Sequence, residues 1–139
     1  MNLIRKTKSK TLKITPKCGN SLYDITSMIN LVLEKNKLKN GLLNIHVQSS
    51  TAAITIQENG ESHLKKDIVL LLNGLVSSYL KTKEILEINN DARIKAALIG
   101  SNKTIPIIKG KLALADCQKI FLCEFDQPNI QRKIIITPI

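Results

Sequence analysis

Apolar and polar residues alternate along six short stretches of this chain, which is the pattern of a half-buried strand. The stretches fall at 11–15, 43–47, 51–58, 104–108, 112–124 and 133–137. The fifth is long enough to be either straight or bent near Ala115. A tight turn at Lys109-Gly110-Lys111 joins the fourth and fifth stretches, so these two are predicted to form a hairpin.

Three other stretches place apolar residues at helical spacing. In the first, which Asp24 or Thr26 can cap, one face carries Ile25, Met28, Ile29, Val32 and Leu33, and Asn40-Gly41 marks the latest end. The second has the clearest apolar stripe, formed by Leu64, Ile68, Leu71, Leu72 and Leu75. The third is a short helix over 92–99, closed by Gly100. Residues 77–90 have no sustained period and are predicted to form a loop.

The elements follow one another as strand, helix, strands, helices and strands, without strict β-α-β alternation. This order favours an α+β fold with mainly antiparallel sheets. The 139 residues fit a single domain, 1–139, in which a basic leader at 1–10 precedes the first strand.

Residues 48–59 stand out because polar groups gather at both ends of one predicted strand. Hydroxyls of Ser49, Ser50 and Thr51 precede the strand, and the pair Glu58-Asn59 ends it. A glutamate at a strand end can act as a general base or bind an amine or hydroxyl of a substrate. It can equally make only a turn contact, and both interpretations remain open.

This stretch resembles the YjbQ family, described as secondary thiamine-phosphate synthases, whose members have His-Thr-Thr-Ala-Ala-x-x-x-Asn-Glu-Asn here. Further similarity is found in the segments at 24–26, 41–42, 92–100, 114–118 and 124–128 and in Asp67, in the family's order. The resemblance implies a two-sheet, mainly antiparallel β-sandwich with flanking helices, assembled as a homotrimer around a threefold axis.

The resemblance also exposes a difference, because this chain lacks the family's histidines. Ser49 and Arg93 stand where two of them are expected, and the third position falls near Lys81 or Thr82. Three converging imidazoles would suit a zinc-like metal, whereas serine and arginine are poor ligands. We therefore predict no metal and no cofactor. The histidines present, His46 and His63, match no family position and are interpreted as surface or hydrogen-bonded residues.

The net charge of +10 raises the question of nucleic-acid binding. Only three arginines and four aromatic residues are present, so a platform for stacking bases is hard to build. The densest cluster of lysines lies at 6–17, around the first strand. We interpret it as a solvated sheet edge, where lysines block edge-to-edge pairing.

The three cysteines are an odd number without metal-type spacing, and we expect small buried thiols in a reducing compartment. The first residues lack the apolar core of a secretory signal, and no apolar run approaches the roughly 20 residues needed to span a bilayer. A cytoplasmic protein without membrane association is expected.

Three functions are compatible with these residues. The preferred one is a diverged trimer that binds a small anionic or phosphorylated ligand through Ser49, Ser50, Thr51 and Arg93. In this hypothesis Glu58 lies at the opposite rim of the same pocket. The first alternative is retained thiamine-phosphate synthase-like catalysis, which the resemblance implies, with Glu58, Asn59 and Gln118 handling polar groups of the substrate. The second alternative is a basic nucleic-acid-binding module. Whether the chain is an enzyme stays undecided at this point, since the lost histidines argue against it.

Overall fold

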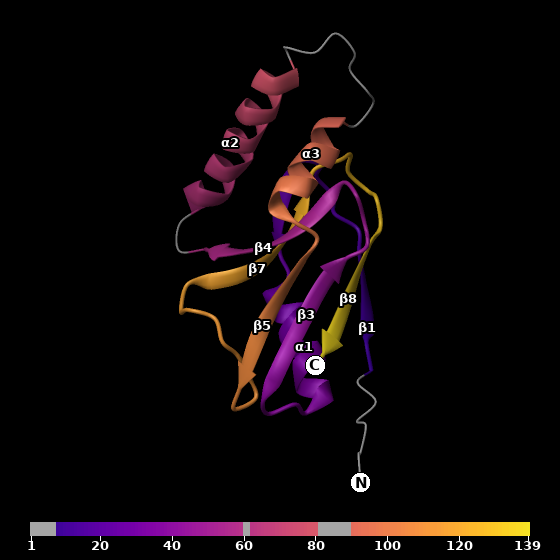
Figure 1. Cartoon of the computed structure of the whole chain (residues 1–139), viewed down its shortest axis with the longest axis vertical. Coiled ribbons are helices and arrows are strands. Elements are labelled where there is room, and N and C mark those ends of the chain that lie inside the picture. The colour runs from indigo at the N-terminus through magenta and orange to yellow at the C-terminus, as the bar shows by residue number, and fades with distance from the viewer. Residues whose placement is uncertain (1–7, 60–61, 81–89) are drawn as a thin grey trace.

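The structure is a computed structural model that describes residues 8–59, 62–80 and 90–139. Figure 1 shows an elongated molecule in which two helices cover one end of the sheets and a third packs near the other. The elements are β1 (Lys10–Ile14), β2 (Ser21–Asp24), α1 (Thr26–Asn36), β3 (Gly41–Val47), β4 (Ala52–Glu58), α2 (Ser62–Leu80), α3 (Asn90–Ile99), β5 (Asn102–Ile108), β6 (Lys111–Leu112), β7 (Gln118–Glu124) and β8 (Arg132–Pro138).

The strands form two sheets in which every pairing is antiparallel. The larger sheet has the order β1-β8-β3-β5-β6, and the smaller has the order β2-β7-β4. The α+β class with two antiparallel sheets is thereby confirmed. β1 lies at the edge of the larger sheet, and Lys10, Lys13 and Lys17 are exposed, so for these three lysines the interpretation as a solvated sheet edge is confirmed.

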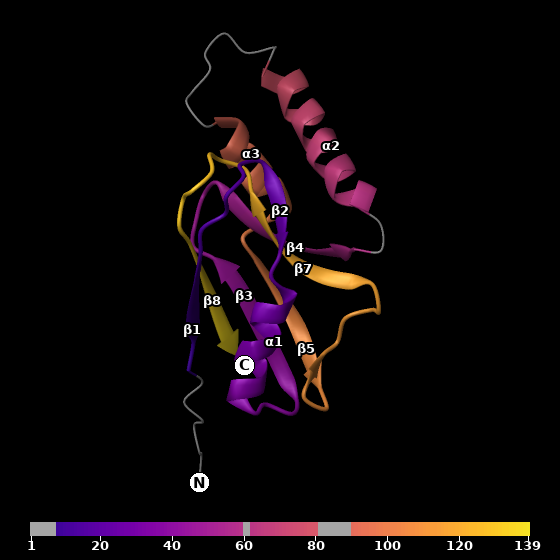
Figure 2. The same ribbon diagram turned by 180° about the vertical axis from the view of Figure 1, so that it is seen from behind.

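Two apolar clusters hold these layers together. In the first, the inner face of the larger sheet packs against α1 and against β4 and β7 of the smaller sheet, with Leu43, Ile45 and Ile136 fully buried. Figure 2 shows α1 over the lower part of the larger sheet and β4 and β7 over its upper part. In the second cluster, the opposite face of the smaller sheet packs against α2 and α3 through Ala53, Leu72 and Ala92, among others. The smaller sheet is therefore covered on both faces.

Coverage on both faces explains one departure from the predicted alternation. Ala52, Ala53 and Ile54 are all buried, because Ala53 faces the helices while its neighbours face the larger sheet. The two small alanines at this point allow both layers to approach the strand.

Of the two alternatives for 112–124, the straight strand is wrong, because regular strand structure is interrupted between Leu112 and Gln118, around Ala115. β6 belongs to the larger sheet and β7 to the smaller, and the segment between them carries the chain from one sheet to the other. The short strand β2, which the alternation pattern did not reveal, pairs with β7 from Ser21 to Asp24.

The first helix ends before Asn40-Gly41, as predicted. Its last residue is Asn36, and Lys37 closes it with a left-handed backbone at φ 52°. Gly41 instead begins β3 with φ +149°, and a Cβ there would lie 2.7 Å from the carbonyl oxygen of Ile139. Glycine is required at this position because the C-terminal residue pairs with Leu42 directly beside it.

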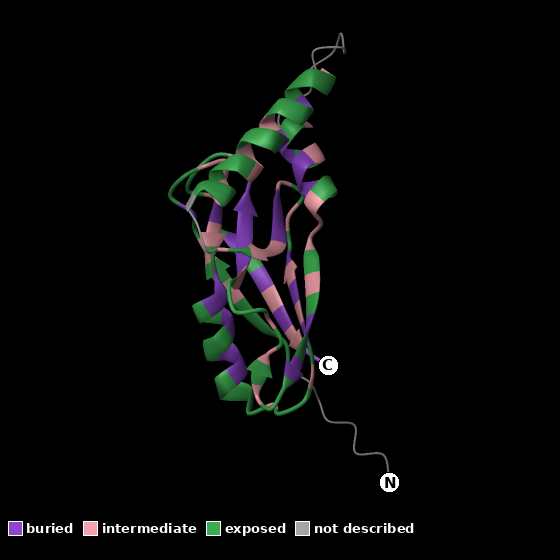
Figure 3. Ribbon diagram, turned by 90° about the vertical axis from the view of Figure 1, so that its left-hand side faces the viewer, coloured by how far each residue is buried: buried purple, intermediate pink, exposed green. Residues whose placement is uncertain are grey.

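The second helix uses its apolar stripe differently from the prediction. Leu72 and Val76 are buried, whereas Leu71 is 72% exposed and Leu75 is 58% exposed. Figure 3 shows the outward side of α2 as exposed along its length. The periodicity was correct for a helix, but part of its apolar face points away from the core of this chain.

Other details of the prediction can be compared directly. The loop proposed at 77–90 overlaps the end of α2 at Leu80, and residues 81–89, which include Lys81 and Thr82, lie outside the described residues. Only Cys123 is a buried thiol, since Cys18 and Cys117 are exposed. In the part of the chain that the structure describes, no helix is long and apolar enough to cross a bilayer.

Candidate functional site

The seven residues predicted to form the site fall into two groups at opposite ends of the smaller sheet. Ser49, Ser50 and Thr51 lead into β4, and Arg93 lies on α3 beside them. Glu58 ends the same strand, which has seven residues. At about 3.3 Å per residue the two ends are roughly 20 Å apart. A single pocket containing Ser49, Arg93 and Glu58 of one chain is therefore not formed.

Glu58, Asn59 and Gln118 do come together at the far end. Glu58 and Gln118 are cross-strand neighbours on β4 and β7, and the backbone N–H of Asn59 donates to the carbonyl oxygen of Cys117 at 2.8 Å. The side-chain oxygen of Gln118 accepts a hydrogen bond of 2.8 Å from the N–H of Ala115. Gln118 thus closes the turn before β7, and its catalytic role stays a prediction.

The near end contains a buried ion pair that joins the two sheets. Arg132 on β8 donates from Nε to one carboxylate oxygen of Glu124 on β7 at 2.8 Å and from Nη2 to the other at 2.9 Å. Its Nη1 also donates to the hydroxyl of Ser49 at 2.7 Å, and its Nη2 donates to that of Thr51 at 2.9 Å. One guanidinium therefore positions two of the three hydroxyls that the sequence assigned to ligand binding, those of Ser49 and Thr51.

The Glu124–Arg132 pair is buried, which affects the ionisation of the Glu124 carboxyl. Glu124 is fully buried and Arg132 is 6% exposed. Burial raises the pKa of the Glu124 carboxyl, and the hydrogen bonds and charge of Arg132 oppose that rise. Two hydrogen bonds to one guanidinium satisfy the carboxylate in a place where an unpaired charge would be costly.

Ser49 is tied into this cluster by three contacts. Its oxygen accepts hydrogen bonds from Arg132 and from the N–H of Thr51 at 3.1 Å. The hydroxyl oxygens of Ser49 and Thr51 also lie 3.4 Å apart, so the Ser49 proton has an acceptor within the protein. An anion beside Ser49 would compete with Thr51 for that proton.

Beside Ser49 is a cavity of about 360 Å³ between β4 and α3. Its lining includes hydroxyls of Ser49, Ser50 and Ser101 together with Arg93, while Ala52, Ala96, Ala97 and Gly100 form the remaining wall. Lys103 lies nearby, and its ammonium donates to the carbonyl oxygen of Ile99 at 3.1 Å. The small residues give room, and the donors and positive charges suit an oxyanion.

The sequence interpretation missed Arg132 and Glu124 as members of this site. A usable signal was present, because both occupy inward positions of strands that are otherwise apolar there. Glu124 continues the inward set of Ile120 and Leu122, and Arg132 precedes Ile134 and Ile136. Opposite charges at inward positions of two strands predict a buried pair.

Within residues 8–59, 62–80 and 90–139, no group of three or more His, Cys, Asp and Glu side chains could hold a metal ion. His46 is half-buried on β3 and His63 is exposed on α2, so they do not share a site.

The fold and this site define a class of small α+β proteins with a helix-covered antiparallel sandwich. The family model described as UPF0047 protein YjbQ-like matches residues 10–139, and the chain belongs to this family. A UPF0047 protein of Methanothermobacter thermautotrophicus is 41% identical over 114 residues, covering 80% of this chain and 78% of its own. One from Methanocaldococcus jannaschii is 41% identical over 108 residues, covering 78% of each.

Solved structures agree with this assignment. A YbjQ-like protein of unknown function from Sulfolobus solfataricus superimposes with a TM-score of 0.85 at 28% identity, covering 96% of both chains. A YjbQ/UPF0047 family protein from Clostridium acetobutylicum has a TM-score of 0.81 at 30% identity, covering 95% of this chain and 99% of its own. The resemblance recognised in the sequence motifs is thereby confirmed.

Proposed function

We propose that this YjbQ-family protein binds a small anionic or phosphorylated ligand in the cavity between β4 and α3, without a three-histidine site. The observation that carries the proposal is the lining of this cavity, where hydroxyls of Ser49, Ser50 and Ser101 lie with Arg93. Hydroxyl groups can donate to an oxyanion, and a guanidinium adds a positive charge that suits the same ligand.

Thermal unfolding with and without inorganic phosphate tests this function. A ligand that binds only the folded state raises the melting temperature by mass action. We expect phosphate to stabilise the wild type, R93A to abolish the response, and K13A to retain it. Lys13 is a matched control, because it is an exposed cation on β1, away from the cavity. Equal stabilisation of wild type and R93A would refute the proposal.

The proposal includes a homotrimer. The exposed stripe on α2, formed by Leu64, Leu71, Leu75 and Tyr79, supports self-association, because covering these side chains removes apolar surface from water. The exposed edge β1 is a second surface that an oligomer can protect.

A second candidate is retained thiamine-phosphate synthase-like catalysis at the far end of β4. It is favoured by the pairing of Glu58 with Gln118 across β4 and β7, which brings a carboxylate and an amide together. Here E58Q should abolish turnover while leaving phosphate stabilisation intact. The absence of turnover in the wild type with thiamine-type substrates would exclude this candidate and leave the binding proposal standing.

A further inference from the structure

A groove of about 420 Å³ lies between β1 and α1. Figure 2 shows the two elements side by side at the end of the molecule opposite α2, so the groove is separate from the apolar stripe on that helix. It also shares no lining residue with the cavity beside Ser49. The side chains that matter below are Lys8, Lys10 and Leu12 from the strand and Met28, Leu31 and Lys35 from the helix.

The floor of the β1–α1 groove is apolar. Leu12 is half-buried and packs against the main core cluster, whereas Met28 and Leu31 are exposed on the outward side of α1. Their side chains form one apolar surface with Leu12. A partner that covers this surface removes it from water and is stabilised by doing so.

The charges around this floor all have the same sign. The titratable lining side chains are Lys8, Lys10 and Lys35, and no carboxylate lines the groove. Within the part of the chain that the structure describes, no hydrogen bond or ion pair engages their ammonium groups. The three lysines are therefore available to carboxylates of a partner.

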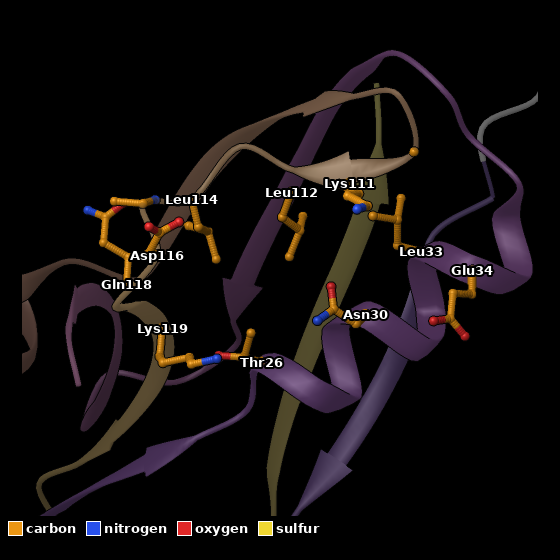
Figure 4. A pocket seen from close by; sticks show the side chains of 12 residues that line it. Thr26, Asn30, Leu33, Glu34, Lys111, Leu112, Leu114, Asp116, Gln118 and Lys119 are labelled. Carbon is orange, nitrogen blue, oxygen red and sulfur yellow. The ribbon is translucent and has the colours of Figure 1, made fainter. Parts of the chain in front are cut away.

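The cavity on the opposite side of α1 shows that this uniform charge is particular to the groove. Figure 4 shows that cavity, in which Lys111 and Lys119 lie with Glu34 and Asp116, so its charges balance. Glu34 is the neighbour of Lys35 in the helix, but it lines the balanced cavity and not the groove. The positive side of α1 is consequently the side that faces β1.

The third feature of the groove is the free edge of β1. This strand pairs only with β8, and among the described residues no backbone hydrogen bond reaches its other side. Unpaired N–H and C=O groups of an edge strand are a template for a further strand. Lysines at the edge repel a second copy of the same edge, but they attract a strand that carries carboxylates. The edge thus favours an acidic partner over self-pairing.

From the floor, the charges and the edge together we infer that β1 and α1 bind an extended, acidic segment of a partner protein. The segment adds a strand beside β1 through main-chain hydrogen bonds, which is a common mode of peptide recognition. Every second side chain of that strand points toward α1. An apolar side chain at one such position covers Met28 and Leu31, and a carboxylate at another contacts Lys10 and Lys35. The inference is independent of the anion site proposed above.

Fluorescence anisotropy with a labelled heptapeptide tests the inference. The probe is blocked at both ends and has the sequence Glu-Thr-Val-Thr-Val-Thr-Glu, so its valines and glutamates share one face of an extended strand. The sequence reads the same in both directions, and the direction of binding therefore does not matter. We expect a Kd on the order of 0.1 mM, because one added strand makes a small interface. Replacing both glutamates by glutamines should weaken binding about tenfold.

Two N-methylated forms of the probe distinguish an added strand from an amphipathic anion that only covers the groove. An extended strand directs alternate N–H groups to its two sides. Methylation of the three threonine nitrogens removes one set of donors, and methylation of the valine and glutamate nitrogens removes the other. One form should lose binding and the other should keep it. If the two forms behave alike, the partner is not an added strand and the inference is wrong.

Matched variants of the protein locate the site. K10E and L31Q should each weaken binding about fivefold. K111E is the charge control, because Lys111 is an exposed lysine at the opposite edge of the same sheet. L98Q is the apolar control, because Leu98 on α3 is 57% exposed and Leu31 is 56% exposed. Both controls should bind like the wild type, and so should R93A, which disrupts only the proposed anion site.

Several results would overturn the inference. They are no binding of the heptapeptide, equal binding of the glutamine form, and an equal loss in K10E and K111E, which would indicate diffuse attraction to a basic chain. Light scattering supplies one more. If K10E and L31Q lower the mass of the assembly and L98Q does not, a second copy of this chain covers the groove in place of an acidic segment.

Discussion

At the scale of single residues, the guanidinium of Arg132 has the most consequences. It contacts Glu124 on the other sheet and the hydroxyls of Ser49 and Thr51 on the connection between sheets. Four of its five N–H groups are thereby engaged inside the protein. Arg132 consequently holds Ser49 at the edge of the cavity between β4 and α3, although Arg132 does not line that cavity.

Removing one partner of this pair should be far more damaging than removing both. E124L leaves a buried, uncompensated guanidinium and should lower the free energy of unfolding by about 3–5 kcal/mol. The double variant E124L/R132M replaces the pair by apolar side chains and should recover much of that loss. Urea unfolding of the wild type, E124L and E124L/R132M measures these free energies of unfolding. If the double variant is as unstable as E124L, the unpaired charge of Arg132 is not the cause of the destabilisation.

Lys95 is a second buried charge, at the junction of α2 and α3. It is 4% exposed, its ammonium donates to the side-chain oxygen of Asn73 at 2.5 Å, and Asp91 lies 4.0 Å away. Burial lowers the pKa of Lys95 below its ordinary value of 10.5, and the charge of Asp91 opposes part of this effect.

This lowered pKa predicts a pH dependence of stability. Between the folded-state pKa of Lys95 and 10.5 the unfolded chain binds more protons, so the lysine's unfavourable contribution is relieved as pH rises. The free energy of unfolding of the wild type should therefore increase relative to K95M as the pH approaches 10.5 from below. Denaturant titrations of the wild type and K95M at a series of pH values approaching 10.5 test this prediction. A difference in the free energy of unfolding that stays constant or shrinks with pH would contradict a lowered pKa for Lys95.

Residue-level prediction from sequence succeeded for groups that are close along the chain and failed for those that are not. Ser49 and Thr51 were identified together because both come directly before one predicted strand. Glu124 and Arg132 are adjacent in space only because β7 and β8 belong to different sheets that pack face to face. Similarly, joining Ser49 and Glu58 in one pocket ignored the length of the strand between them.

At the scale of elements, local signals placed most helices and strands. The end of α3 at Ile99 and its closing Gly100 were predicted to the residue, whereas the helix begins at Asn90, two residues before the predicted start. β6 and β7 were merged, because alternation continues through a segment that changes sheets. The exposure of Leu71 was missed, since periodicity identifies an apolar face but not what covers it.

Two glycines in different elements give a matched test of backbone requirements. G41A should lower the free energy of unfolding by at least about 1 kcal/mol, because φ is +149° and the new Cβ meets the Ile139 oxygen. G74A in α2 meets nothing within 4 Å and should raise it by about 0.5–1 kcal/mol through helix propensity. Thermal or urea unfolding distinguishes the two. A destabilised G74A would show that α2 is constrained by something beyond its own helix.

At the scale of the whole molecule, the account predicts self-association. Light scattering at micromolar concentration should give a mass three times the 15.5 kDa of one chain. L71E/L75E places charges on two exposed leucines of the α2 stripe and should shift the protein toward smaller species without unfolding it. A monomer mass for the wild type would refute the trimer. If L71E/L75E is still a trimer, the subunit interface does not include this part of α2.

The central claim is that the cavity beside Ser49 and Arg93 binds a small anion, and its rival is diffuse attraction of anions to a basic chain. Amide chemical shifts measured during a titration with inorganic phosphate separate the two. The account predicts saturable shifts confined to residues 49–52 and 93–101, which border the cavity, and their loss in R93A. Unsaturated shifts spread over β1 and other lysine-rich surfaces, unchanged in R93A, would contradict it.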